Sequence, residues 1–470
     1  MKVLEKIPFN LQLLLAFIIA FGVITYQSRE YEPQLRTGDS YIYLSTAKGL
    51  IDKGVLTNGT FSETFPEEGK NGEGLFFTPI YPAFLASIMK FDQKFYNDAS
   101  CHINSIGTQS FENCGNYYDS VIIAQTFLGA LTAFFIMLTA FLMTKNLALS
   151  WTAFAIGLMS GIYGQYATEI MTEAVLFPLF ALANLFIVLG WKYRKSCKRS
   201  ALMWFLAGLF LGLTTLTRPA YAYVVYIGIF FIYFLYFLVS KDGFKKSFRF
   251  PLILALGFSI ITSAWVIRNG IATGEYVISK GYGPYILIQR LAYNDMTWKE
   301  WGVSFLYYLP DFGDKLASSI FNEQNYKRFD YGNQNGFFYI GHTTLREKIT
   351  KEVESADNLM NTAINNYLIP NFTKHTVVTF SMLFNGIWIG KYWALITFPM
   401  FLFVLWTALK HRWYEFVILA FPGIFMWGFH AFTSVNVTRY NMVLVPCLSF
   451  ATAWVLFELI KTIKNISKES

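Results

Sequence analysis

The chain has 470 residues, of which 54% are apolar and only 14% are charged, and it contains 48 Phe, 29 Tyr and 12 Trp. Ordinary globular domains carry roughly 25% charged residues, so this composition excludes a set of soluble domains and predicts a membrane protein. The aromatic content excludes intrinsic disorder, and four cysteines exclude a disulfide-dense scaffold. The net charge of +8 does not predict nucleic-acid binding, because the basic residues collect beside apolar segments.

Ten segments free of Asp, Glu, Lys and Arg are long enough to cross about 30 Å of hydrocarbon as helices. The first is expected to remain as an anchor, since no small-x-small cleavage pattern follows it. An eleventh stretch, 376–390, is too short to cross and is expected to lie at the interface. The ten predicted spans are 8–26, 120–144, 147–168, 174–191, 200–217, 219–240, 250–267, 392–409, 416–438 and 440–457.

The basic residues near the span ends predict the orientation of the chain. Segment 192–199 holds five basic residues and no acid, segment 241–249 holds four basic residues and one acid, and Lys410 and Arg412 follow a later span. These sites fall on one side, which the positive-inside rule assigns to the cytoplasm together with both termini. The chain is therefore expected to be one integral membrane unit, with outer segments 27–118 and 268–391 and three spans in 392–470.

The two outer segments contain apolar residues at helical spacing. Residues 41–52 and 79–91 predict two amphipathic helices on the membrane surface, and 342–368 predicts a third that packs on the outer side. Residues 57–75, which are rich in Gly, Glu and Asn, are expected to form a loop between the first two.

Charged residues at the outer ends of apolar helices are costly to desolvate, so they tend to face a cavity or a partner. Arginines can clamp phosphate oxygens, and a carboxylate can accept a proton from an attacking hydroxyl or amine. The alternatives are interfacial anchoring for the arginines, a structural role for Glu169 and a helix N-cap for Asp39. The charged residues that the topology places at this depth are Asp39, Glu169, Glu173, Arg218, Arg268 and Arg439.

Other motifs point to no further chemistry. The chain contains no GxxxxGK[ST] and no HExxH, and residues 311–314 (DFGD) resemble a kinase signature without any other kinase element. Tyr221, Tyr223 and Tyr226 are expected either to pack or face lipid, or to line an apolar groove.

The charged positions lie within motifs that resemble the GT-C class of membrane glycosyltransferases, in particular the bacterial protein mannosyltransferases and lipid A aminoarabinose transferases. The resemblance covers nearly the whole chain, but two departures exist: Phe77-Thr78 replace a basic residue common before the proline motif, and no second acid stands beside Asp39. The motifs are Gly38-Asp39-Ser40-Tyr41, Thr78-Pro79-Ile80-Tyr81-Pro82, Thr172-Glu173, Leu216-Thr217-Arg218-Pro219, Trp265-Val266-Ile267-Arg268-Asn269 and Arg439-Tyr440.

The resemblance implies an all-α polytopic fold and an inverting transfer of a sugar from a polyprenyl-phosphate donor to a lipid, glycan or protein acceptor. It implies a site on the extracytoplasmic face of a cell membrane, such as a bacterial inner membrane, with Asp39 as the base. Glu173 is also a candidate ligand for a divalent metal, although the resemblance demands no cofactor. The substrate-binding residues that it implies are Tyr41, Glu173, Arg218, Arg268, Asn269, Arg439 and Tyr440.

Three other classes of function stay open. A transporter or flippase would use charges in the middle of its spans, whereas these lie at outer ends. A polysaccharide ligase or polymerase would also have many spans, large outer loops and arginines, and a scaffold or sensor would not need converging charges.

The four cysteines divide by their predicted environment. Cys101 and Cys114 lie in the first outer segment, whereas Cys197 lies in a basic inner loop and Cys447 in a span. Because the outer side is oxidising, a disulfide between Cys101 and Cys114 is expected, with two buried thiols as the alternative.

Overall fold

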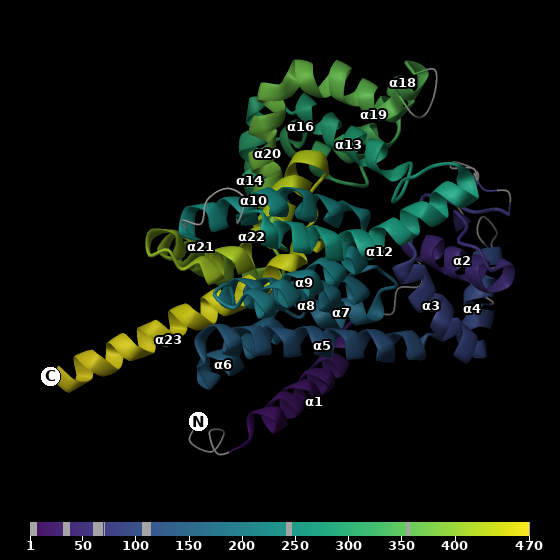
Figure 1. Cartoon of the computed structure of the whole chain (residues 1–470). Coiled ribbons are helices and arrows are strands. Elements are labelled where there is room, and N and C mark those ends of the chain that lie inside the picture. Colours follow the sequence, from purple (N-terminus) through teal and green to yellow (C-terminus); the bar gives the residue numbers. More distant parts are fainter. Residues whose placement is uncertain are drawn as a thin grey trace. The chain divides into compact units, whose positions relative to one another are not determined.

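The structure is a computed structural model that describes residues 7–31, 38–59, 69, 71–105, 114–240, 247–353 and 358–469. Every regular element in these residues is helical (Figure 1), which confirms the predicted all-α class. Within the described residues, nine helices are long and apolar enough to cross a membrane, and a bent pair makes a tenth if it counts as one span. The chain is therefore a polytopic membrane protein.

The chain divides into two compact units. The first unit comprises residues 1–279, 400–422 and 445–470, and the second comprises 280–399 and 423–444. Helices α21 (Tyr392–Lys410) and α22 (Tyr414–Thr433) contribute residues to both.

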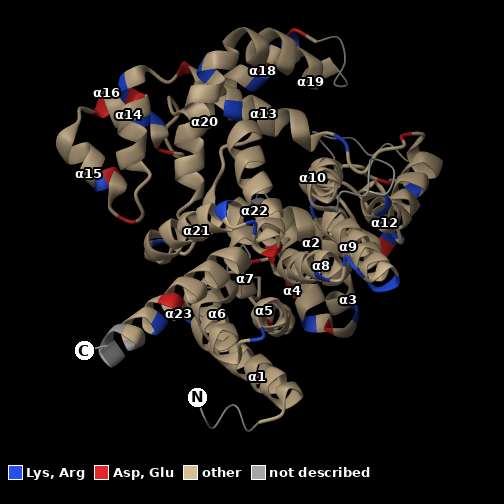
Figure 2. Cartoon of the chain, turned by 60° about the vertical axis from the view of Figure 1, so that its left-hand side comes forward, with Lys and Arg blue, Asp and Glu red and all other residues tan. Residues whose placement is uncertain are grey.

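The first unit carries most of the long apolar helices. Figure 2 shows that Lys, Arg, Asp and Glu lie mainly at helix ends and in loops, and that the long helices are mostly uncharged. The helices of this unit are α1 (Phe9–Ser28), α2 (Gly38–Lys53), α3 (Ile80–Phe91), α4 (Gln93–Asn104), α5 (Asp119–Thr144), α6 (Leu147–Met159), α7 (Ile162–Thr168), α8 (Glu173–Lys192), α9 (Cys197–Thr217), η4 (Pro219–Tyr221), α10 (Ala222–Ser240), α12 (Arg249–Thr273) and α23 (Val445–Glu469).

Helices α8, α9 and α12 form the packed centre of the first unit. A Cβ atom on Gly208 of α9 would lie 2.1 Å from the carbonyl oxygen of Leu254, and one on Gly257 of α12 would lie 2.3 Å from that of Phe205. The two backbones therefore touch, which only glycine permits and which is a common way for membrane helices to associate. Because α9 also packs along α8, the first turn of α8 is held next to the last turn of α9.

The first predicted outer segment contains three helices that share a hydrophobic cluster. The expected surface helices at 41–52 and 79–91 are α2 and α3, and α4 packs beside them around buried Phe95. Cys101 and Cys114 form a disulfide with Cα atoms 5.7 Å apart, as expected from the sequence. Parts of the expected loop at 57–75 lie outside the described residues.

The span expected at 147–168 is not one straight helix. Helix α6 ends at Met159 and α7 begins at Ile162, with a 47° bend between them. Gly161 has φ = +69°, a left-handed conformation that glycine adopts without strain. Two other predicted boundaries also shift: α22 ends at Thr433 rather than 438, and the last span runs from Thr438 to Ile463.

The second unit is built from short helices. Arg290 and Phe337 are fully buried in its interior. The elements of this unit are α13 (Tyr282–Ala292), η5 (Tyr293–Asp295), α14 (Trp298–Tyr307), α15 (Gly313–Ile320), α16 (Glu323–Tyr326), η6 (Lys327–Phe329), α17 (Phe337–His342), α18 (Thr344–Lys351), α19 (Leu359–Thr362), η8 (Ala363–Leu368), η9 (Ile369–Asn371), α20 (Phe372–Gly386) and η10 (Thr438–Leu444).

The prediction of a single amphipathic helix at 342–368 was wrong. Helix α18 ends at Lys351, short of the predicted end, and α19 (Leu359–Thr362) is a separate helix that continues as the π-helical turn η8. Ile349 and Leu359 are buried in one hydrophobic cluster with α13, so each piece packs separately. The apolar stretch at 376–390 is largely α20, whose 15 residues are too few to cross a bilayer.

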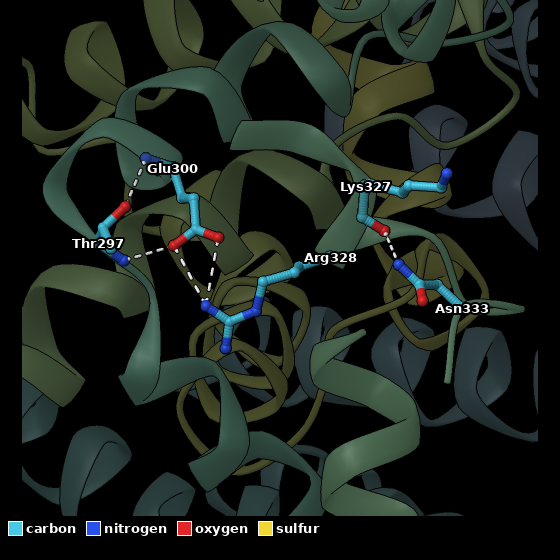
Figure 3. A network of polar contacts seen from close by, with 5 residues as sticks. All are labelled: Thr297, Glu300, Lys327, Arg328 and Asn333. Carbon is cyan, nitrogen blue, oxygen red and sulfur yellow. Dashed lines mark hydrogen bonds and ion pairs between the residues drawn. The ribbon is translucent and has the colours of Figure 1, made fainter. Parts of the chain in front are cut away.

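A polar network in the second unit has a structural role (Figure 3). Thr297 and Glu300 form a reciprocal capping box at the start of α14, and Glu300 also accepts a bond from Arg328 at 3.3 Å. The Arg328 guanidinium lies 4.1 Å from the Phe337 ring centroid. These contacts join α14 to η6 and α17. Glu300 and Arg328 neutralise each other, so the network needs no ligand to balance its charges.

Candidate functional site

The charged centre of the first unit is a buried ion pair between Glu173 and Arg218. Nη1 of Arg218 donates to Oε1 of Glu173 at 2.9 Å, and the Thr172 hydroxyl donates to Oε2 at 3.1 Å. The Glu173 side chain is 2% exposed, whereas that of Arg218 is 17% exposed. The pair therefore has one partner sealed in the protein and one that reaches solvent.

The local sequence explains the geometry of Arg218. The proline at 219 disfavours a helical conformation for the residue before it, and Arg218 is extended, with φ = −147° and ψ = 110°. This ends α9 and directs the chain into η4, where Tyr221 is buried against Phe180 at a centroid distance of 5.5 Å. The Arg-Pro sequence thus places a guanidinium at a helix end.

Buried polar side chains fix the loop that precedes Glu173. The Tyr81 hydroxyl of α3 donates to Oε1 of Gln125 at 3.0 Å. Nε2 of Gln125 donates to the carbonyl oxygens of Ala167 and Glu169 at 3.0 and 2.9 Å. Burial raises the pKa of the Tyr81 phenol well above its ordinary value, so it stays a neutral donor.

Asp39 and Tyr41 lie at the start of α2, which contacts the same loop. Asp39 is in the first turn, where a carboxylate interacts favourably with the helix N-terminus, and it is half-buried. The neighbouring Ser40 is buried, and its hydroxyl donates to the carbonyl oxygen of Ile170 at 3.4 Å. The first turn of α2 is therefore fixed close to the residues that lead into Glu173.

Arg268 and Asn269 act together near the end of α12. Asn269 is fully buried; its Nδ2 donates to the carbonyl oxygen of Val277 at 2.8 Å, and its Oδ1 accepts from Nη1 of Arg268 at 3.0 Å. The Arg268 guanidinium lies 4.8 Å from the Trp265 ring centroid, and Nε1 of Trp265 donates to the carbonyl oxygen of Ile278 at 2.9 Å. Asn269 thus orients Arg268 and holds the chain that follows α12.

Glu73 is a buried acid that the sequence analysis did not single out. Its side chain accepts from the backbone N–H of Asn71 at 2.9 Å and from the Asn71 amide at 3.0 Å, and it interacts electrostatically with Arg268. Burial acts to raise the pKa of Glu73, but these hydrogen bonds and the charge of Arg268 outweigh it, so the pKa is lowered. The only sequence signal was an acid shortly before the Thr78-Pro79 motif.

Arg439 and Tyr440 belong to the second unit. They lie in η10, with the Arg439 guanidinium 5.3 Å from the Tyr440 ring centroid, and that ring lies 4.8 Å from the ring of His430. Tyr331 interacts electrostatically with both residues of the motif. The expected convergence of Arg439 with Arg218 and Arg268 stays a prediction.

A known protein family matches the segment that contains most of the candidate site residues. Residues 73–289 match the family model of the dolichyl-phosphate-mannose-protein mannosyltransferases. Over this segment the match confirms the resemblance drawn from the motifs. No curated protein matches the chain. The crystal structure of ArnT from Cupriavidus metallidurans bound to undecaprenyl phosphate is similar over 94% of this chain and 77% of its own, with 11% identity and a TM-score of 0.39.

The contacts of Glu173 do not support its candidate role as a metal ligand. Its carboxylate is already engaged by Arg218 and Thr172, and nearby Glu169 accepts from the side chain of Gln165 at 3.0 Å. Among the residues that the structure describes, no group of three or more His, Cys, Asp or Glu could hold a metal ion. Glu173 is the counter-ion of Arg218, and the donor set does not fit a divalent metal.

The three tyrosines after Arg218 do not line one groove. Tyr221 is buried, whereas Tyr223 and Tyr226 are roughly half exposed on α10. An apolar cavity does lie beside α10, but its walls are aliphatic and phenylalanine side chains with Gly228 and Pro422. Tyr223 and Tyr226 are therefore surface residues of an apolar helix.

Proposed function

We propose that this protein is a membrane glycosyltransferase that moves a sugar from a polyprenyl-phosphate donor to an acceptor on the extracytoplasmic side. The observation that carries the proposal is the Glu173–Arg218 pair, which is buried at a helix end and lies within the segment that matches the mannosyltransferase family. An ion pair with one sealed partner and one exposed partner can present a guanidinium to a phosphate without leaving its own charge unbalanced.

In this proposal, the two arginines of the first unit stabilise the leaving group. Arg218 is anchored by Glu173, and Arg268 is oriented by Asn269 and influenced by Glu73. As the bond between the sugar and the phosphate oxygen breaks, negative charge develops on the lipid phosphate. Guanidinium groups that are already oriented stabilise this charge without reorganising during the reaction.

Asp39 acts as the general base. The acceptor hydroxyl or amine attacks the anomeric carbon from the face opposite the phosphate, so the configuration inverts. Its proton passes to the Asp39 carboxylate, and the electron pair of the broken bond leaves with the polyprenyl phosphate. The first-turn position of Asp39, one residue from the bond between Ser40 and Ile170, supports this role because it brings the acid near the loop that leads to Glu173.

The test is donor turnover by purified protein in nanodiscs, measured as release of polyprenyl phosphate from a panel of polyprenyl-phosphate sugars with crude membrane acceptors. We expect Asp39→Asn to fold and to bind donor, but to lose about 10²- to 10⁴-fold in rate, the usual contribution of a general base. Asparagine keeps the size and hydrogen-bonding capacity of the side chain at a helix start.

Asp92→Asn is the matched control. Asp92 caps α4 in the same cluster of surface helices and accepts from the backbone N–H of Phe95 at 3.1 Å. We expect wild-type turnover for this variant. Wild-type turnover in Asp39→Asn would show that Asp39 is only structural, and absence of donor turnover in the wild-type protein across the panel would contradict the transferase proposal.

A further inference from the structure

One lysine follows α5 and another ends α8, where the ends of the two helices lie side by side. Lys145 follows the last residue of α5 in a left-handed conformation, with φ = 57°, and Lys192 is the last residue of α8. Nζ of Lys192 donates to the carbonyl oxygen of Leu142 in the final turn of α5. This bond fixes the Lys192 ammonium group against α5, and the charges of Lys192 and Lys145 repel each other.

Helix ends explain part of this arrangement. The carboxyl end of a helix carries partial negative charge, so one cation there is favourable. Lys192 meets that need by binding the Leu142 carbonyl. Within the described part of the chain, the Lys145 ammonium group makes no such bond, and it lies 5.2 Å from the Phe141 ring centroid. A second ammonium group beside the first therefore remains to be explained.

Glu415 does not neutralise the two lysines. Glu415, in the first turn of α22, lies 3.5 Å from Nη1 of Arg194 and attracts Lys192 only at longer range. Within the described part of the chain, neither Lys145 nor Lys192 has a carboxylate within 4 Å. The cluster of Lys145, Lys192 and Arg194, called here the lysine cluster, thus carries three positive charges against one negative charge.

We propose that the lysine cluster binds the phosphodiester headgroup of an anionic phospholipid. A phosphodiester placed between the two ammonium groups would remove their repulsion and accept their N–H bonds. A lipid fits better than a soluble anion because both lysines lie at the ends of helices long and apolar enough to span a membrane, where headgroups are found. The proposal is independent of the proposed glycosyl transfer.

The experiment measures lipid binding to the purified full-length protein by native mass spectrometry, with phosphatidylglycerol and phosphatidylcholine as probes. We expect phosphatidylglycerol to bind more tightly. The double variant Lys145→Gln/Lys192→Gln should lose about 30-fold in its affinity, since each basic residue near an anionic lipid contributes roughly a fivefold factor. The exposed residue Lys145 also gives a single variant, Lys145→Gln, with an expected loss of about fivefold.

The matched control is Lys195→Gln/Lys198→Gln, which removes the same charge from two exposed lysines, one in the turn after α8 and one in the first turn of α9. We expect less than about a twofold change in this control, because exposed charges that are held by no other contact interact only weakly through solvent. Equal losses in both double variants would show only diffuse attraction and would overturn the proposal. Equal affinity for the two lipids, or displacement of phosphatidylglycerol by millimolar inorganic phosphate, would also overturn it. If the double variant does not fold, unchanged binding by Lys145→Gln decides against the site.

Discussion

Two arginines, one in each unit, show how a buried cation can be used in different ways. Arg218 in the first unit binds the Glu173 carboxylate and keeps 17% exposure. Arg290 in the second unit is fully buried and donates to neutral acceptors: the carbonyl oxygens of Ala431 and His375 at 2.9 and 3.1 Å, the Thr379 hydroxyl at 3.1 Å and the amide oxygen of Asn294 at 3.2 Å.

The two guanidinium groups differ in whether a ligand can reach them. The acceptors of Arg290 belong to η5, α20 and α22, so this residue of α13 joins three further elements and is closed to any ligand. Burial lowers the pKa of Arg290 to about 9. Arg218 has a fixed counter-ion and a route to solvent, which is the arrangement that a phosphate-binding residue needs. Replacing Arg290 should therefore reduce the stability of the second unit, whereas replacing Arg218 should weaken phosphate binding.

The largest expected effect on stability is for Arg290→Met. The substitution keeps an apolar stem, but leaves two backbone carbonyls and the Thr379 hydroxyl without their donor. Each buried acceptor that loses its donor costs about 1–3 kcal/mol, so the loss over the whole network should be several kcal/mol. Thermal unfolding in detergent should show a large decrease in Tm for the second unit. A loss below about 1 kcal/mol would mean that Arg290 does not hold these elements together.

A smaller effect is expected on acidification, through His375. Its Nε2 donates to the carbonyl oxygen of Phe432 at 2.9 Å, and its Nδ1 faces Oδ1 of Asn294 at 3.1 Å. Burial, and then the charge of Arg290, lowers the pKa of His375 to about 4, from about 6.5 in the unfolded chain. Protonation would add a second buried cation beside Arg290.

The direction of the pH effect follows from this shift. Between about pH 6.5 and pH 4 the unfolded chain binds the proton more tightly, so stability falls as the pH is lowered through this window, by about 3 kcal/mol. Unfolding of wild type and His375→Gln should be compared from pH 7.5 to 4.5, with His411→Gln, at an exposed position, as the control. An identical pH profile for His375→Gln would exclude His375 as the titrating group.

The sequence predicts the spans and the surface helices because both depend on local composition. Continuous apolar length defines a span, and helical spacing of apolar residues defines α2 and α3, whatever they pack against. Such reasoning does not find the break at Gly161 or the division between α18 and α19, since each depends on how the two pieces pack.

The candidate site is only partly readable from the sequence for a related reason. Arg218 is recognisable because it precedes a proline at a span end, and Glu173 because it opens an apolar helix. Arg290 and Glu73 look like ordinary loop charges, and only tertiary contacts make them buried. Partners distant in the chain determine which charged residues are structural, and one sequence does not specify those partners.

The most direct test of the account is lipid binding by Arg218→Lys. Wild type and variant are titrated with polyprenyl phosphate and with the matching polyprenol, in nanodiscs containing phosphatidylglycerol so that other anion sites are saturated. Lysine keeps the charge beside Glu173 but not the planar fork. Arg199→Lys, at an exposed position in the first turn of α9, is the control. We expect Arg218→Lys to lose about tenfold or more of the preference for the phosphate, since a hydrogen bond to a charged group contributes about 1.5–3 kcal/mol. The Tm of this variant should stay near wild type, and the control should keep the full preference. An unchanged preference in a folded Arg218→Lys protein would contradict the account, because Arg218 would then be a structural residue like Arg290.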